Sequence, residues 1–208
     1  MKWPLQPIWQ GKDVFILGGG PSVKTFPVER RLKRQRVVGC NDAYLFGDGI
    51  VDVLVFGDRT WYDHHKDKPK FQSFRNPKIT NHKDLEGDPA VIWAPREQEG
   101  FHRHALGWNG NTGSSAINVA LLLGAGRVLL VGFDMALGEG GKSNWHHNPL
   151  NTPENKHYAR YMDAISRTMS MILDKWPGVK IINLNPNSAM DLFPRKSWED
   201  VFQGKESK

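Results

Sequence analysis

A short apolar segment, residues 15–17, runs directly into three consecutive glycines, and this junction constrains the fold of the 208-residue chain more than any other feature. Glycine lets the backbone take positive φ and approach a ligand closely, and a following Pro-Ser pair suits the first turn of a helix. The N–H groups of such a turn, with the positive end of a helix dipole, attract an anion. The junction therefore predicts a nucleotide-binding α/β domain with a phosphate site formed by Gly18, Gly19, Gly20, Pro21 and Ser22.

Apolar segments alternate with longer amphipathic ones along the chain. We expect strands at 14–17, 36–40, 51–56, 90–93, 127–131 and 179–184, and helices at 28–34, 113–123 and 157–176, while 62–89 is a polar stretch. Strands that are apolar throughout and separated by helices indicate a parallel sheet covered on both faces. The predicted fold class is α/β, a single doubly wound (Rossmann-like), mostly parallel sheet with helices on both faces. We expect one domain over 1–202 and a frayed tail at 203–208.

Composition narrows the class of protein. Hydrophobic residues at 39% and charged residues at 24% are typical of a globular domain, and no apolar run has the length of a membrane span or a signal peptide. The single cysteine, Cys40, excludes an internal disulfide framework and indicates a reducing cytoplasm. The net charge of +6 favours anionic partners such as nucleotides or nucleic acid, although we interpret the basic run 30–36 as a solvated helix face. A homo-oligomer is compatible with this composition.

Polar side chains follow the expected strands at their carboxyl ends, where ligands of open α/β sheets bind. Each asparagine or aspartate taken alone is explained by a helix cap or an Asx-turn. Taken together, polar groups after five apolar strands favour a functional cleft. Besides the glycine turn, the candidate ligand-binding residues at these strand ends are Asn41, Asp42, Asp58, Asp134, Asn185, Asn187 and Ser188.

A second anion site is expected where Asn111, Thr112 and Gly113 begin a helix, because helix N-termini present unpaired N–H donors. The glycine turn matches neither of two common phosphate motifs. Position 23 is valine where a dinucleotide fold has its third glycine, and the turn does not continue into the Gly-Lys-Ser/Thr of a Walker motif. Both departures count against an ordinary dinucleotide fold and against P-loop phosphoryl transfer.

The order of these motifs resembles that of a known family. The segments concerned are 18–22 (GGGPS), 39–42 (GCND), 111–113 (NTG), 129–134 (LLVGFD) and 185–188 (NPNS). They are similar to the bacterial sialyltransferases of glycosyltransferase family 42. More loosely, they resemble archaeal 6-hydroxymethylpterin pyrophosphokinase-like proteins and phage proteins of similar layout.

The resemblance implies an inverting, metal-independent sugar transfer from a cytidine monophosphate donor, with a histidine as general base. It implies that Asn41 and Thr112 bind the donor, that the Asn-Pro-Asn-Ser turn lies near the nucleotide, and that His157 is the counterpart of the base. The chain departs from the family at Gly19, where the family has asparagine. Two tyrosines that hold the leaving phosphate in the family fall at about Ala136 and Lys142, and Lys142 could supply a point charge instead.

The segment 135–156 contains three glycines and many polar groups, so we expect it to form a mobile, lid-like loop. A neutral imidazole titrates near working pH and could accept the proton of an acceptor hydroxyl. The candidate catalytic residues are therefore His157, His147 and His146. A metal site of His146, His147 and Asp134 is not favoured, because adjacent histidines point in different directions and no His-x-x-x-His pattern occurs.

These observations together favour a transferase that moves a sugar from a CMP- or UDP-type donor to a hydroxyl acceptor, without a permanently bound cofactor. The acceptor could be a glycan, a small molecule or, since Trp61, Trp108 and Trp145 offer stacking surfaces, a nucleic acid. Asp58 could bind a ribose, an acceptor or a metal-bound nucleotide. The alternatives are an ATP- and Mg²⁺-dependent pyrophosphokinase-like transferase and a non-catalytic nucleotide-binding module.

Overall fold

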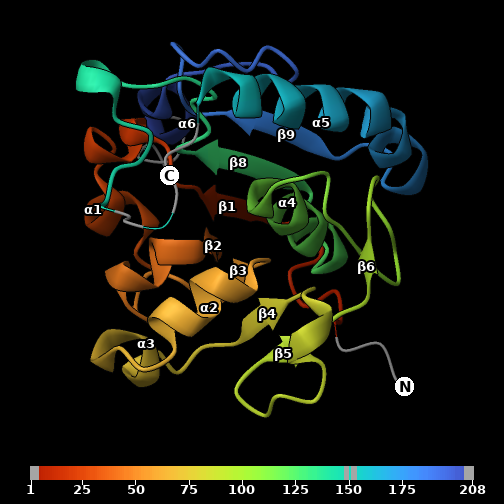
Figure 1. Ribbon diagram of the computed structural model, residues 1–208. Coiled ribbons are helices and arrows are strands. Elements are labelled where there is room, and N and C mark those ends of the chain that lie inside the picture. The colour runs from red at the N-terminus through yellow and green to blue at the C-terminus, as the bar shows by residue number, and fades with distance from the viewer. Residues whose placement is uncertain (1–4, 148–149, 151–153, 204–208) are drawn as a thin grey trace.

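The computed structural model describes residues 5–147, 150 and 154–203. Its centre is a seven-stranded sheet with the order β5-β4-β3-β2-β1-β8-β9, and every neighbouring pair is parallel. The strands are β1 (Asp13–Leu17), β2 (Val37–Cys40), β3 (Val53–Phe56), β4 (Lys78–Thr80), β5 (Ile92–Trp93), β8 (Arg127–Val131) and β9 (Lys180–Asn183). Figure 1 shows them stacked from β9 at the top to β5 at the bottom, with the arrowheads of β1 and β8 pointing to the left. That left-hand edge is the carboxyl edge of these two strands.

Helices cover both faces of the sheet because successive strand residues point to opposite sides. In β1, Val14 and Ile16 belong to one apolar core with residues of α4 (Thr112–Leu122) and α5 (Asn155–Lys175). Phe15 and Leu17 belong to the other core, with α1 (Val28–Leu32), α2 (Arg59–His65), α3 (Pro69–Ser73) and α6 (Trp198–Gln203). The predicted α/β class, with a doubly wound sheet, is confirmed.

The two long helices follow from their sequences in different ways. All faces of α4 consist mainly of apolar and small residues. The helix is buried and packs across β1, β2 and β3. In contrast, α5 is amphipathic: the apolar Ile165 and Ile172 are buried, while the charged Asp163 and Arg167 are exposed. It begins at Asn155, two residues before the predicted start, because Glu154 and His157 form a capping box at its first turn.

Several elements differ from the prediction. The polar stretch 62–89 contains β4, α3 and most of α2, none of which was predicted. These elements are short and show little hydrophobic periodicity, and β4 is held in place by pairing with neighbouring strands. The strand expected at 90–93 is only Ile92–Trp93. A two-stranded sheet of β6 (Arg96–Glu97) and β7 (Leu106–Gly107) was not predicted, and neither were the 3-10 turns η2 (Asn41–Phe46), η3 (Lys83–Leu85) and η4 (Glu139–Gly141). The Pro-Ser pair begins a 3-10 turn, η1 (Pro21–Lys24).

The C-terminal end and the basic run also differ from expectation. Gln203, predicted as part of a frayed tail, closes α6, while 204–208 lie outside the described residues. Within the basic run, Arg31 is not simply solvated. Its guanidinium lies 5.0 Å from the ring centroid of Trp198 and 5.1 Å from that of Phe202, so it attaches α6 to α1. In the described part of the chain, no helix has the length and apolar character needed to cross a membrane.

Candidate functional site

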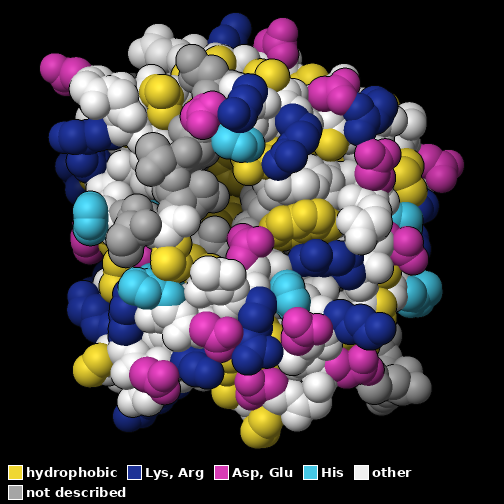
Figure 2. Space-filling model, in the orientation of Figure 1, with side chains coloured by type: hydrophobic (Ala, Val, Ile, Leu, Met, Phe, Trp, Pro, Cys, Tyr) yellow, Lys and Arg dark blue, Asp and Glu magenta, His cyan; other side chains and the backbone are white. Residues whose placement is uncertain are grey.

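A cavity of about 760 Å³ opens at the carboxyl edge of the sheet, between the first turns of α4 and α5. Figure 2 shows the hollow above and to the left of the centre of this face. Among the predicted site residues, those that line it are Gly18, Gly19, Gly20, Asn41, Asp58, Asn111, Thr112, Gly113, Asp134 and His157. Those that do not are Pro21, Ser22, Asp42, Lys142, His146, His147, Asn185, Asn187 and Ser188.

The glycine turn lines the cavity, but most of its N–H groups are already used. The amide of Gly18 donates to the carbonyl of Val131 at 2.8 Å, and that of Gly20 donates to the carbonyl of Gly132 at 2.9 Å. The prediction that the amides of this turn bind a phosphate is therefore wrong for these two residues. They are glycines because the residue after β8 passes so close: a Cβ on Gly20 would lie 2.6 Å from the carbonyl oxygen of Gly132.

Asp134 joins the glycine turn to the segment after β9. Its carboxylate accepts hydrogen bonds from the amide and hydroxyl of Ser22, at 3.2 and 2.9 Å, and from Nδ2 of Asn185 at 2.9 Å. Burial raises the pKa of this carboxyl, and the Ser22 and Asn185 hydrogen bonds oppose that rise. Ser188 in turn donates to the carbonyl of Phe133 at 2.6 Å. These predicted ligand-binding residues thus hold strand ends together.

A second, smaller cavity of about 170 Å³ lies behind the glycine turn. Ser22, Asn185 and Asn187 line this second cavity and not the large one. The amide of Asn187 donates to Oδ1 of Asn185 at 2.9 Å, which forms an Asx-turn. This turn explains the asparagine at 185 without a bound ligand.

The N-terminus of α4 faces the large cavity with free backbone donors. Asn111 caps the helix, because its Oδ1 accepts the amide of Ser114 at 2.8 Å. The amides of Thr112 and Gly113 precede that capped position and have no carbonyl within the helix to bond, as is general for the first residues of a helix. With most of the glycine-turn amides bonded to the sheet, this helix start is the better anion site.

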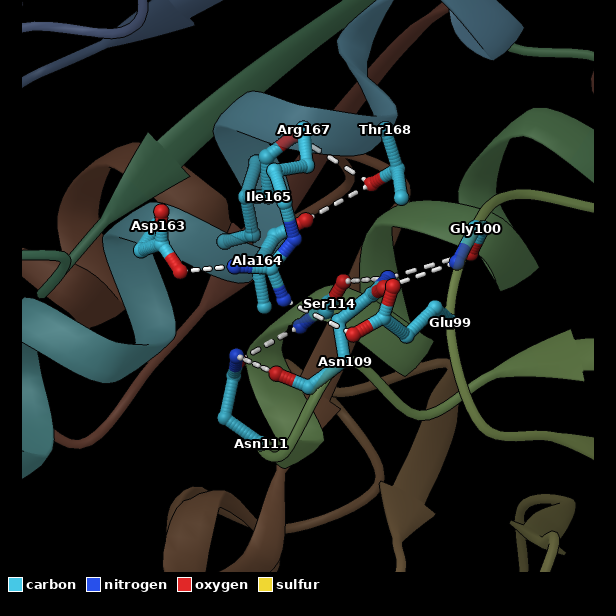
Figure 3. A network of polar contacts seen from close by, with 10 residues as sticks. All are labelled: Glu99, Gly100, Asn109, Asn111, Ser114, Asp163, Ala164, Ile165, Arg167 and Thr168. Atoms are coloured by element: carbon cyan, nitrogen blue, oxygen red, sulfur yellow. Dashed lines mark hydrogen bonds and ion pairs between the residues drawn. The ribbon is translucent and has the colours of Figure 1, made fainter.

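Buried Asn109 fixes the wall beside α4 (Figure 3). Its Oδ1 accepts the amide of Gly100 at 2.8 Å, and its Nδ2 donates to the carbonyl of Gly100 at 3.0 Å and to Oγ of Ser114 at 2.6 Å. The backbone of Asn109 is left-handed, with φ of 46°, which asparagine tolerates better than most residues. The segment before β7 is thereby tied to the first turn of α4.

Figure 3 also shows how this wall reaches α5. Arg167 forms ion pairs with Asp163 on its own helix and with Glu99, the latter at 2.7 Å. Its charge is therefore largely neutralised. Arg160, two turns earlier, also lines the cavity and forms no ion pair with any described residue; its guanidinium lies 5.5 Å from the ring of Tyr161.

His157 lies at the start of α5, as expected, but its ring nitrogen has a structural partner. The backbone N–H of Glu154 donates to Nδ1 of His157 at 2.9 Å. In the neutral ring the hydrogen must therefore be on Nε2. Beside it, Tyr158 and Tyr161 line the cavity, and burial raises the pKa of Tyr158. Tyr161 was not predicted, although its spacing of four residues from His157 places both on one helix face.

The other candidate histidines lie outside the large cavity. His147 is exposed, while the side chain of His146 is 7% exposed and its Nδ1 lies 3.6 Å from Oδ1 of Asp42. The same oxygen is 3.7 Å from Nε2 of His65, and the other oxygen of Asp42 accepts the indole N–H of Trp61 at 2.8 Å.

The predicted binding role of Asp42 and catalytic role of His146 are thus not supported by their positions. Both belong to a buried polar cluster beneath the loop. Lys142 is exposed and does not line the cavity. Residues 148–149 and 151–153 of the predicted lid-like loop lie outside the described residues. Within the described part of the chain, no three His, Cys, Asp or Glu side chains gather to hold a metal ion.

Three further residues give the cavity its polar and aromatic character. Asn41 has a left-handed backbone, with φ of 49°, and its buried Oδ1 has no hydrogen-bond partner among described residues. Asp58 follows β3, and desolvation by the cavity walls raises its pKa even though the residue remains exposed. Trp108, predicted as a stacking surface, lines the cavity and packs against Gly57 so closely that a Cβ there would lie 2.1 Å from the ring.

No protein-family model and no curated protein sequence matches the chain. Solved structures of the sialyltransferase CstII from Campylobacter jejuni are similar to it. The complex with the substrate analogue cytidine-5′-monophosphate matches with a TM-score of 0.55 and 16% identity, over 90% of this chain and 86% of that chain. The complex with CMP-3FNeuAc matches with a TM-score of 0.55 and 15% identity, over 89% and 86%. The chain therefore has a fold similar to that of this sialyltransferase, as the sequence motifs predicted.

Proposed function

We propose that the large cavity binds a nucleotide-activated sugar of the CMP or UDP type and transfers the sugar, with inversion, to a hydroxyl acceptor. One observation carries the proposal: the cavity lies at the carboxyl edge of the sheet, with the N-terminus of α4 on one wall and Arg160 on the other. A helix N-terminus and a guanidinium are the groups that stabilise a phosphate. The fold likeness to a sialyltransferase crystallised with CMP supports the same reading.

In this proposal the donor phosphate lies between the amides of Thr112 and Gly113 and the guanidinium of Arg160. Negative charge grows on that phosphate as the bond to the sugar breaks, so fixed donors there lower the barrier. Asn41 offers its unpaired Oδ1 to a hydroxyl or amino group of the nucleoside. The chemistry needs no resident cofactor and no divalent metal. The single domain expected over 1–202 is extended by one residue in this proposal, because Gln203 closes α6.

Isothermal titration calorimetry with CMP, UDP and ATP, each with and without Mg²⁺, tests the proposal. CMP or UDP should bind without metal. Arg160→Met should weaken that binding about 10- to 100-fold, the effect of losing one hydrogen bond to a charged group. Lys180→Met is the matched control, because Lys180 is exposed at the start of β9, at the opposite edge of the sheet. The affinity of this variant for CMP or UDP should equal that of the wild type.

Other outcomes identify the alternatives. Binding of ATP only in the presence of Mg²⁺ would contradict the proposal and support a pyrophosphokinase-like transferase. Tight CMP or UDP binding without release of that nucleotide from the corresponding CMP- or UDP-sugar would support a non-catalytic nucleotide-binding module. Equal affinities of Arg160→Met and Lys180→Met would show that the phosphate does not lie against α5.

A further inference from the structure

Asp58 places an unused carboxylate on the wall of the large cavity. It directly follows Gly57 at the carboxyl end of β3 and is the N-cap residue of α2. Aspartate at this position usually accepts an N–H of the first helical turn. Here the side chain forms no capping hydrogen bond, and its carboxylate makes no hydrogen bond or ion pair with any described residue. Both oxygens are thus available to a molecule in the cavity.

A fixed positive charge lies near this carboxylate without pairing with it. Nη2 of Arg96, on β6, donates to the carbonyl of Gly57 at 2.8 Å and to Oδ1 of Asn81 at 3.1 Å. The guanidinium also lies 4.5 Å from the ring centroid of Trp108. These three contacts hold Arg96 in place, so it cannot swing out to neutralise Asp58.

Two opposing influences act on the proton affinity of Asp58. Desolvation raises the pKa of its carboxyl, and the charges of Arg96 and His82, which face it from β6 and from the segment after β4, lower the pKa. The net direction is upward. A carboxylate with a raised pKa is a better proton acceptor than an ordinary one.

His157, on the other side of the cavity, is poorly arranged for the same task. Its Nδ1 accepts the N–H of Glu154, and its Nε2 carries the hydrogen of the neutral ring. To accept a proton at Nε2 the ring would have to lose the capping hydrogen bond that begins α5. The ring is instead suited to donate a hydrogen bond from Nε2.

We propose that Asp58 is the general base that accepts the proton of the acceptor hydroxyl, and this inference rests on the proposed function. As the O–H bond breaks, the proton passes to a carboxylate oxygen of Asp58. The acceptor oxygen forms a bond to the anomeric carbon of the sugar. The bond from that carbon to the phosphate oxygen breaks, and its electron pair leaves with the nucleotide phosphate. Trp108, which packs against Gly57 next to Asp58 in the chain, also lines the cavity.

The test measures CMP release from CMP-N-acetylneuraminic acid, with water and with lactose as acceptors, after subtraction of the uncatalysed rate. Asp58→Asn keeps the shape of the side chain and should lower kcat by about 10²- to 10⁴-fold, the usual contribution of a general base. CMP affinity by calorimetry should stay within about two-fold. Asp58→Glu should restore part of the rate. Asp63→Asn is the matched control, an exposed carboxylate on the same helix that should leave kcat unchanged.

The pH dependence supplies a readout that a structural role would not change. The wild-type rate should fall as the pH drops through the pKa of Asp58, and Asp58→Asn should lose this acidic limb. His157→Gln should keep it. An Asp58→Asn rate within five-fold of wild type, or an acidic limb lost only in His157→Gln, overturns the inference while nucleotide binding stands. Failure of the wild-type chain to bind CMP or UDP overturns the proposed function, and the base role of Asp58 with it.

Discussion

Replacement of Gly20 by alanine should destabilise the fold. Glycine is needed at this position because neighbouring atoms leave no room for a Cβ, and not because of its backbone conformation. Its φ is −64°, which alanine adopts readily. A Cβ at this position would lie 1.8 Å from Oδ2 of Asp134 and 2.6 Å from the backbone oxygen of Gly132. The Asp134 side chain would have to turn away and lose its hydrogen bonds from Ser22 and Asn185.

The magnitude follows from those bonds. Hydrogen bonds to a charged group contribute about 1.5–3 kcal/mol each, and partial solvation of the released carboxylate offsets some of the loss. We therefore expect Gly20→Ala to lower the free energy of unfolding by about 3–5 kcal/mol, a large share of the roughly 5–15 kcal/mol typical of a domain. At about 2–4 °C per kcal/mol for a chain of this size, the melting temperature should fall by roughly 6–20 °C.

Urea unfolding followed by tryptophan fluorescence measures this difference. The matched control is Gly19→Ala, one residue earlier in the same turn. Its new Cβ would lie 3.1 Å from Oδ1 of Asn144, the end of a side chain that can move. We expect less than about 1 kcal/mol for this variant, as for most substitutions without a core or backbone effect. If Gly20→Ala unfolds within 0.5 kcal/mol of Gly19→Ala (about the scatter of such comparisons), the close packing of the turn on Asp134 is refuted.

Two further predictions concern buried polar groups. Burial holds the pKa of His65 at about 4, below its ordinary 6.5, so the unfolded chain binds a proton more readily than the folded one. Stability present above pH 6.5 should be lost as the pH falls toward 4, and His65→Gln should make the urea midpoint less dependent on pH in that window. Asn109→Gly should cost about 2–4 kcal/mol through loss of the bonds to Gly100 and Ser114. Asn109→Ala should cost about 1 kcal/mol more because φ is positive, and equal urea midpoints would contradict this.

The fold class could be predicted because it follows from local hydrophobic patterns in the sequence. Apolar strands such as 127–131, separated by helices, leave few arrangements other than a covered parallel sheet. The short β4 could not be predicted: Lys78-Ile79-Thr80 has one strongly apolar residue and becomes a strand only because β3 and β5 pair with it. The same holds for α2 and α3, which are too short to show a helical period.

The location of the candidate site was also predictable, since the carboxyl ends of parallel strands meet at one edge. Asn41, Asp58 and Asp134 therefore come together without any knowledge of side-chain positions. The contribution of Arg160 and Tyr161 was harder to predict, because it depends on how α5 crosses the end of the sheet.

The residue pattern alone is enough to predict that a strand ends in a glycine turn, and that this turn lies at the ligand-binding edge of a doubly wound sheet. The role of the turn depends on contacts that form only in the folded chain. The approach of β8 takes up the N–H groups of Gly18 and Gly20, and the burial of His146 against Asp42 removes one candidate base from the cavity. The reason is physical: local residue patterns specify backbone conformation, whereas hydrogen-bond partners and solvent access depend on segments more than a hundred residues apart.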